Sequence, residues 1–267
     1  MTDKEGHFRF ERAPDGVATL TLDRPETLNS LTFGIYRSLE RLFVDLQTDE
    51  SVKVLVITGA GRGFCSGGDV HDIIAPLLER NLEGTLEFTR MTGAVIRNMR
   101  RLTKPIIAAI NGTAAGAGAV IALASDLRLM SDRASFAFLF TKVGLTGADM
   151  GAAHLLPMVV GAGRAAELLM LGDKIDAAEC HRIGLANRVV PADKLDEEAL
   201  SLARRLAAGP TQALAMTKRL LVDESYLGLD SAIEQEALAQ AVLLRAHDHR
   251  EFYEAWKEKR PPRFEGR

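Results

Sequence analysis

Residues 105–126, PIIAAINGTAAGAGAVIALASD, constrain the fold of this chain more than any other segment. The apolar run that ends at Ile110 has the pattern of a short buried strand, and Asn111-Gly112 interrupts it. The helix expected over residues 116–124 is apolar on every face, which predicts that it is buried. The segment therefore predicts a strand, a turn and a helix that all lie inside the core.

The turn before this helix consists of small residues, Gly116, Ala117 and Gly118. A helix start has unpaired N–H groups and a partial positive charge, and these side chains would let a ligand oxygen approach closely. Small residues would equally let a buried helix pack tightly against a sheet. This turn alone leaves both interpretations open, a cradle for an anion and a close packing contact.

A second segment repeats the pattern. Residues 52–59, VKVLVITG, indicate a buried strand, and residues 62–72, RGFCSGGDVHD, follow it. Residues 66–69, Ser-Gly-Gly-Asp, again form a strand-to-helix turn with little side chain. Two such turns can direct two backbone N–H groups at one oxygen atom.

Strand and helix patterns alternate along the first part of the chain, which predicts an α/β domain. Strands are expected over residues 8–12, 16–22, 52–58, 106–110, 127–130 and 187–190. Helices are expected over residues 32–48, 69–78, 86–102, 150–160 and 163–171, with a polar break at 79–84. Beyond residue 190 the pattern is helical, over residues 194–207, 211–222, 229–246 and 249–259. We therefore expect two units, residues 1–190 and residues 191–267.

Both turns resemble the oxyanion-hole segments of the crotonase (enoyl-CoA hydratase/isomerase) superfamily. The resemblance covers nearly the whole chain, including LTLDRPETLNSLT, GFCSGGDV, LGDKIDAAECHRIGLANRVV and the final FYEAWKEKRPPRF. It implies an α/β crotonase (ClpP-like) fold, in which repeated β-β-α units form a spiral core that holds the CoA and acyl site. It also implies that the helical C-terminal subdomain closes the pocket and forms a homotrimer or a hexamer.

The resemblance implies that the N–H groups of Gly68 and Ala117 hold the thioester oxygen of an acyl-CoA. CoA is then part of the substrate, and no permanently bound cofactor is expected. The residues implied to contact CoA are Ser66, Gly67, Gly68, Asp69, Val70 and Lys259.

Enoyl-CoA hydratases use two glutamates, and the matching positions here are Val120 and Phe140. Neither side chain can transfer a proton, so the sequence argues against ordinary hydration. Asp149 remains, because related isomerases, dehalogenases and synthases have a functional Asp in a similar place. Burial beside Phe138 and Phe140 would raise its pKa toward neutrality. Asp149 also precedes a predicted helix, so the alternative is a helix N-cap.

Three functions follow from these residues. The first is an acyl-CoA-processing enzyme of the enoyl-CoA hydratase/isomerase type that stabilises a thioester enolate, with isomerisation, hydration by a non-standard route and hydrolysis all open as its reaction. The second is a thioesterase or dehalogenase-like hydrolase with Asp149 as the nucleophile. The third is a protein that binds CoA thioesters without catalysis.

Composition bounds the partners and the compartment. The net charge of −3 gives no reason to expect nucleic acid or an anionic membrane surface. No apolar run approaches the roughly 20 residues that span a bilayer, and the N-terminal MTDKEGHFRF lacks a signal core. The two cysteines, Cys65 and Cys180, indicate no disulfide framework, and the six histidines show no metal-binding spacing. We therefore expect a cytoplasmic protein without a metal, in which Cys65 is a small buried residue.

Overall fold

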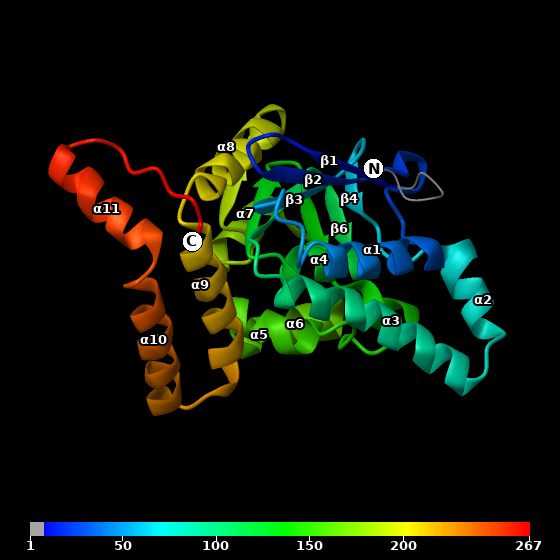
Figure 1. Cartoon of the computed structure of the whole chain (residues 1–267). Coiled ribbons are helices and arrows are strands. Elements are labelled where there is room, and N and C mark those ends of the chain that lie inside the picture. Colours follow the sequence, from blue (N-terminus) through cyan, green and yellow to red (C-terminus); the bar gives the residue numbers. More distant parts are fainter. Residues whose placement is uncertain (1–7) are drawn as a thin grey trace.

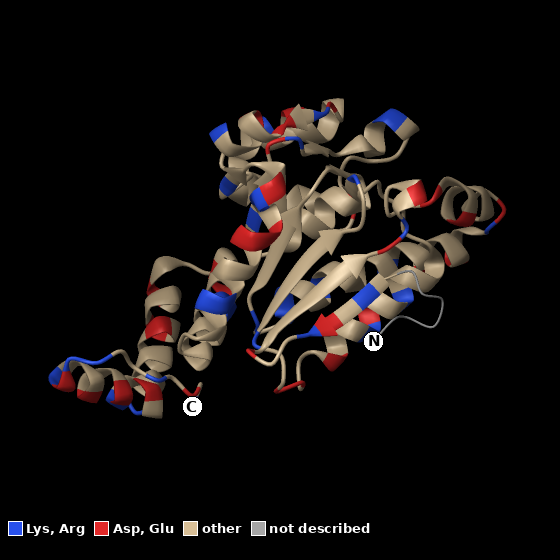
Figure 2. Cartoon of the chain, turned by 90° about the horizontal axis from the view of Figure 1, so that it is seen from above, with Lys and Arg blue, Asp and Glu red and all other residues tan. Residues whose placement is uncertain are grey.

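The computed structural model describes residues 8–267 and has the expected α/β architecture, with two sheets surrounded by helices (Figure 1). The expectation that the N-terminal segment lacks a signal core concerns mainly residues 1–7, which lie outside the described residues. Figure 2 shows that Lys, Arg, Asp and Glu lie mainly on the helices and connecting loops, with both signs interspersed. No helix in the described part of the chain is long and apolar enough to cross a membrane.

The larger sheet has six strands in the order β1-β2-β3-β5-β7-β10. Strand β1 runs antiparallel to β2, and the remaining neighbours are parallel. The strands are β1 (Phe8–Arg12), β2 (Val17–Leu22), β3 (Val54–Gly59), β5 (Ile106–Ile110), β7 (Leu127–Ser131) and β10 (Arg188–Val190). These strands agree with the sequence-based expectation to within two residues.

The smaller sheet has four strands in the order β4-β6-β8-β9. They are β4 (Gly63–Cys65), β6 (Thr113–Ala115), β8 (Ser135–Ala137) and β9 (Ile175–Asp176). The sequence analysis missed this sheet, because strands of two or three residues are too short to show an alternating pattern. Strands β3, β5 and β7 of the larger sheet are each followed by a strand of the smaller sheet. This is the expected repeat of β-β-α units.

Helices cover both faces of the larger sheet. The helices are α1 (Phe33–Asp45), α2 (Ala75–Leu78), α3 (Leu82–Arg101), α4 (Ala117–Ala124), α5 (Ala152–Val160), α6 (Ala162–Leu171), α7 (Ala177–Arg182), α8 (Leu195–Ala207), α9 (Thr211–Asp223), α10 (Leu229–Leu243) and α11 (His247–Glu258). Every residue of α4 is buried, as its apolar composition predicts. Helix α8 packs the buried face of Leu195, Ala199 and Ala203 against β3 and β5.

Two expected helices between the turns differ from the structure. Residues 69–78 form a π-helical turn, Val70–Ile74, and then the short helix α2, not one continuous helix. Helix α3 begins at Leu82, inside the expected polar break, because Asn81 Oδ1 accepts a hydrogen bond from the Gly84 N–H at 2.9 Å. Asn81, which lies in the expected polar break, thus caps the next helix.

Lys218 of α9 joins the C-terminal helices to the core. Its side chain is buried, pairs with Asp126 at 2.8 Å and donates to the carbonyl oxygen of Lys104 at 2.9 Å. Helices α10 and α11 lie away from the sheets (Figure 1). Three aromatic residues of α11, Phe252, Tyr253 and Trp256, are more than half exposed. The tail is held by polar contacts, including the N–H groups of Glu265 and Gly266 on Asp248.

Two glycines allow a matched test of this packing. A Cβ on Gly118 would lie 2.3 Å from the carbonyl oxygen of Cys65, so Gly118→Ala is expected to lower the free energy of unfolding by ~1–3 kcal/mol. A Cβ on Gly93 of α3 would meet no atom within 4 Å, so Gly93→Ala is expected to raise it by ~0.5–1 kcal/mol. Urea unfolding of both variants measures the difference, and equal stabilities would contradict the packing of α4 on β4.

Candidate active site

The two glycine-rich turns are in contact. Strands β4 and β6 pair in parallel, so the segments that follow them leave the same edge of the smaller sheet. Gly67 has a φ of 102°, and a Cβ there would lie 3.1 Å from the Ala115 carbonyl oxygen and 3.5 Å from the Ala117 nitrogen. Gly116 has a φ of 51°, and its Cβ would lie 3.7 Å from the Gly67 Cα. Both positions need a glycine, because L side chains rarely adopt these angles.

Each turn presents an unpaired backbone N–H group. Ala117 is the first residue of α4, whose N-cap has no side-chain hydrogen bond. In the other turn, the Leu31 N–H donates to the Gly67 carbonyl and the Asp69 N–H donates to the Leu31 carbonyl. This parallel bridge turns the N–H of Gly68 away from Leu31. Within residues 8–267, neither the Gly68 nor the Ala117 N–H has a protein acceptor. Two such groups on touching turns suit an oxygen that carries negative charge.

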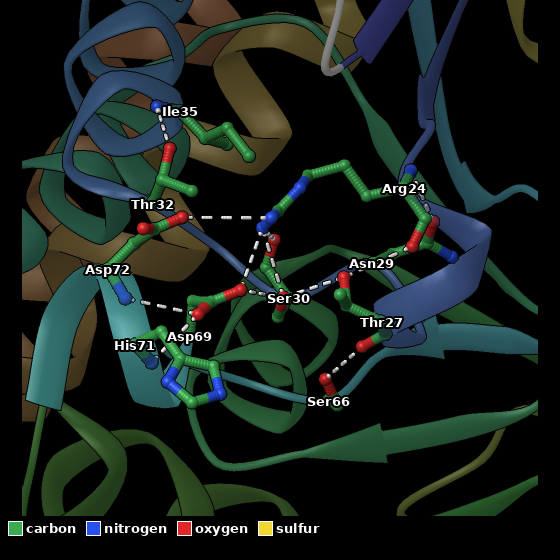
Figure 3. Close-up of polar contacts among 10 residues, drawn as sticks. All are labelled: Arg24, Thr27, Asn29, Ser30, Thr32, Ile35, Ser66, Asp69, His71 and Asp72. Atoms are coloured by element: carbon green, nitrogen blue, oxygen red, sulfur yellow. Dashed lines mark hydrogen bonds and ion pairs between the residues drawn. The ribbon is translucent and has the colours of Figure 1, made fainter.

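A buried carboxylate holds the first turn in place (Figure 3). Asp69 Oδ1 accepts from the N–H groups of His71 and Asp72 at 3.0 and 3.1 Å. Asp69 Oδ2 accepts from Ser30 Oγ at 2.7 Å and Arg24 Nη1 at 3.0 Å. Burial opposes ionisation of Asp69, but these hydrogen bonds outweigh it and lower its pKa to about 2. The side chain therefore supports the turn.

The Ser66 side chain is also used by the fold. Its hydroxyl donates to the Thr27 carbonyl oxygen at 2.9 Å, and its N–H donates to the Leu28 carbonyl oxygen at 2.9 Å. Val70, in contrast, is 61% exposed. Of the residues expected to contact CoA in this segment, Val70 presents its side chain outward, while Ser66 and Asp69 direct theirs into the turn.

Asp149 does not cap a helix, which corrects the alternative given for it. Helix α5 begins at Ala152 with Gly151 as N-cap. Among the described residues, Asp149 Oδ1 accepts a hydrogen bond only from the neighbouring Met150 N–H, at 2.8 Å. Met150 has a φ of 49°, a left-handed conformation that is unfavourable for a residue with a side chain. Burial raises the pKa of Asp149, and the hydrogen bond from Met150 opposes that shift only in part. The carboxylate thus caps no helix and lies next to a residue in a strained backbone conformation.

Tyr36 lies near both Asp149 and Cys65, the last residue of β4. Burial raises the pKa of Tyr36 well above its ordinary value, and the nearby Cys65 and Asp149 raise it further. Cys65 lies on β4 directly beside Gly118, and its own pKa is raised to about 12 by burial, so it is the inert buried thiol that was expected. Tyr36 therefore lies within electrostatic reach of both the acidic side chain and the strand before the first turn.

The remaining expected site residues lie in different surroundings. Val120 and Phe140 are buried in the same apolar core as Tyr36, Ala117 and Met150. Lys259 ends α11, which Figure 1 places far from α2 and β4, so this chain alone does not bring it to the turns. No group of three or more His, Cys, Asp or Glu side chains in the described residues is placed to hold a metal ion.

Sequence analysis missed Arg24, Ser30 and Tyr36. Arg24 and Ser30 belong to the segment LTLDRPETLNSLT, but nothing in a linear pattern pairs them with Asp69. Tyr36 did carry a signal, since Tyr36, Leu39 and Phe43 follow helical spacing and are all buried. A hydroxyl at one position of an apolar helical face would have identified it.

Comparison with known proteins gives consistent matches over the whole described chain. The family model described as enoyl-CoA hydratase/isomerase matches residues 12–267. The chain is 36% identical to the 1,2-epoxyphenylacetyl-CoA isomerase of Escherichia coli K12, over 97% of this chain and 99% of that protein. It superposes with a TM-score of 0.97 on the crystal structure of a proposed enoyl-CoA hydratase from Streptomyces coelicolor A3(2), at 51% identity over 100% of this chain and 97% of the other. The TM-score with the enoyl-CoA hydratase of Bacillus anthracis is 0.92, at 29% identity over 98% and 100% of the two chains.

Proposed function

This chain belongs to the enoyl-CoA hydratase/isomerase (crotonase) superfamily and has its α/β fold, and we propose that it isomerises an acyl-CoA thioester through an enolate. In this proposal the N–H groups of Gly68 and Ala117 donate to the thioester oxygen. The observation that carries the proposal is the close approach of the two turns, each of which has an N–H group without a protein acceptor among the described residues. Losing one such donor lowers kcat by about 100-fold or more in comparable sites.

Asp149 would move the proton. Its carboxylate would take a proton from the acyl chain next to the thioester, so that the C–H electrons form the enolate and the negative charge develops on the held oxygen. The protonated carboxyl would then return the proton to another carbon. A raised pKa suits this role, because the acid and base forms must both be accessible near neutral pH.

Isomerisation fits the site better than hydration does. The two positions at which hydratases are expected to carry glutamates are Val120 and Phe140, and both are buried and apolar. We propose that this site therefore lacks the pair of carboxylates that would activate water. The similarity to a protein named as an isomerase supports the same choice.

We also propose that the chain acts as a homotrimer or a hexamer, with residues 191–267 as its assembly unit. Exposed apolar residues gather on the last two helices, α10 and α11. Contact with another copy of the chain would bury these residues. These are Leu229, Ile233, Leu238 and Val242 on α10 with Phe252 and Trp256 on α11. Residues 66–70 would contact CoA from one copy, and Lys259 would approach the same CoA from a neighbouring copy.

Incubation with acyl-CoA thioesters in deuterated water tests the proposed function. We expect deuterium to enter the acyl chain of an aryl- or dienoyl-CoA, with or without a shift of its double bond, as measured by mass spectrometry. Crotonyl-CoA should not be hydrated at a comparable rate. Binding without exchange across the panel would support a non-catalytic role, and an acyl-aspartyl adduct at Asp149 would support a hydrolase.

A further inference from the structure

We propose that the hydroxyl of Tyr36 is a binding group of the acyl site, which donates a hydrogen bond to an oxygen atom on the acyl chain. The preferred substrates would be thioesters with a hydroxyl, epoxide or keto oxygen on the carbons next to the thioester. This inference rests on the proposed function, and it names the class of substrate that the same site takes.

The position of Tyr36 is fixed by the first turn. Leu31 bridges Gly68, and Thr32 caps α1 by accepting the Ile35 N–H at 3.2 Å. Tyr36 follows within the first turn of that helix and is only 2% exposed. The capped helix start therefore places Tyr36 five residues after Leu31, the residue that bridges Gly68.

The ring of Tyr36 packs against one aromatic neighbour, which in turn packs against a second. It packs edge-on against Phe88 of α3, with ring centroids 5.8 Å apart and planes at 87°. Phe88 packs in the same manner against Phe33, at 5.1 Å and 72°. Edge-to-face aromatic pairs are favourable and directional, so the hydroxyl has a defined place.

The phenolic oxygen has no partner and yet is not sealed. Within residues 8–267 it makes no hydrogen bond to another protein group. Three side-chain oxygens in that range are both unpaired and closed to solvent, those of Thr141, Gln212 and Glu224. The Tyr36 oxygen is not one of them, so it is not fully closed to solvent. A buried donor that has no protein partner and is not closed to solvent can donate a hydrogen bond to an acceptor on a ligand.

The surroundings of the phenol select the kind of acceptor. Burial and the neighbouring Asp149 keep Tyr36 protonated, so it donates a hydrogen bond and does not act as a base. The thioester oxygen already has two donors in the proposed site, Gly68 and Ala117. The Tyr36 hydroxyl is thus left for a second oxygen near the carbons that Asp149 would serve. A substrate without that oxygen would leave the Tyr36 hydroxyl unpaired. A buried donor without a partner lowers the affinity of a site for such a substrate.

Affinities of matched thioesters for Tyr36→Phe test the inference. The pairs are 3-phenylpropanoyl-CoA with its 3-hydroxy analogue, and phenylacetyl-CoA with its 2-hydroxy analogue, measured by calorimetry. Loss of one buried hydrogen bond should weaken binding of at least one hydroxylated thioester by about 3- to 10-fold. The parent thioesters should keep their affinity within about 2-fold, because no bond to them is lost.

Tyr226→Phe is the matched control, since it removes the same atom from an exposed tyrosine whose hydroxyl bonds His154 at 2.9 Å. It should change none of the four affinities. An equal change for parent and hydroxylated thioesters in Tyr36→Phe, or no change for any of them, would overturn the role of Tyr36 alone. If the wild-type protein binds none of the four, the proposed function fails and the inference fails with it.

A second measurement does not depend on the stability of the variant. Wild-type protein labelled with fluorotyrosine contains three reporters, Tyr36, Tyr226 and Tyr253. The fluorine signal of the buried ring should shift on binding a hydroxylated thioester and shift less with its parent. Equal shifts for both members of each pair would count against the proposed contact.

Discussion

Replacement of Asp149 by Asn is expected to lower kcat/KM for an acyl-CoA substrate by about 10²- to 10⁴-fold, with little effect on the fold or on thioester affinity. The amide oxygen of Asn can still accept the Met150 N–H, which is the contact that Asp149 Oδ1 makes at 2.8 Å. It cannot carry the proton. Because Asp149 caps no helix, the usual stability cost of losing a cap does not enter. Turnover, thermal unfolding and Kd for one thioester separate these effects.

The dependence of the rate on pH gives the same prediction a second readout. Burial raises the pKa of Asp149 above its ordinary 3.8, and the reaction needs the ionised form. The rate should therefore fall as the pH drops through that raised pKa, and this acidic limb should be absent in Asp149→Asn. A variant that keeps full turnover, or an unchanged acidic limb in the residual activity, would show that another group transfers the proton.

Replacement of Ala117 by Pro is expected to reduce kcat by about 100-fold or more. Proline removes the N–H group that would donate to the thioester oxygen, and its ring fills the space where that oxygen would sit. The helix itself should tolerate the change, because Ala117 is the first residue of α4 and proline is favourable at that position. The variant should therefore unfold at nearly the wild-type temperature while its turnover is largely lost.

Ala162→Pro provides the matched control for this loss. Ala162 is the first residue of α6, after Gly161, and belongs to no part of the proposed site. The Ala162→Pro variant should keep both the stability and the activity of the wild-type protein. If Ala117→Pro were as active as Ala162→Pro, the N–H of Ala117 would not be an oxyanion donor, whatever the contact between the two turns.

Local sequence patterns were sufficient to predict the main strands and helices, but not the short strands and helix starts between them. The strands of the larger sheet and the buried helix α4 follow from apolar runs and their spacing, which are properties of the chain itself. The smaller sheet was missed, since its strands are stabilised by pairing with distant segments and carry no pattern of their own. The start of α5 was misplaced for a similar reason, because Met150 and Gly151 adopt left-handed angles that apolar spacing does not reveal.

The same division holds for the site. The residues alone predicted two turns with little side chain, Val120 and Phe140 at the positions where hydratases are expected to carry glutamates, and Asp149 as the acid of the site. Only the tertiary structure decided that the backbones of Gly67 and Ala117 lie close together and that Arg24 and Ser30 hold Asp69. It also decided that Asp149 lies close enough to Tyr36 to raise its pKa. The physical reason is that residue types limit which chemistry is available, whereas distances between segments far apart in the sequence depend on how the strands pair and the helices pack.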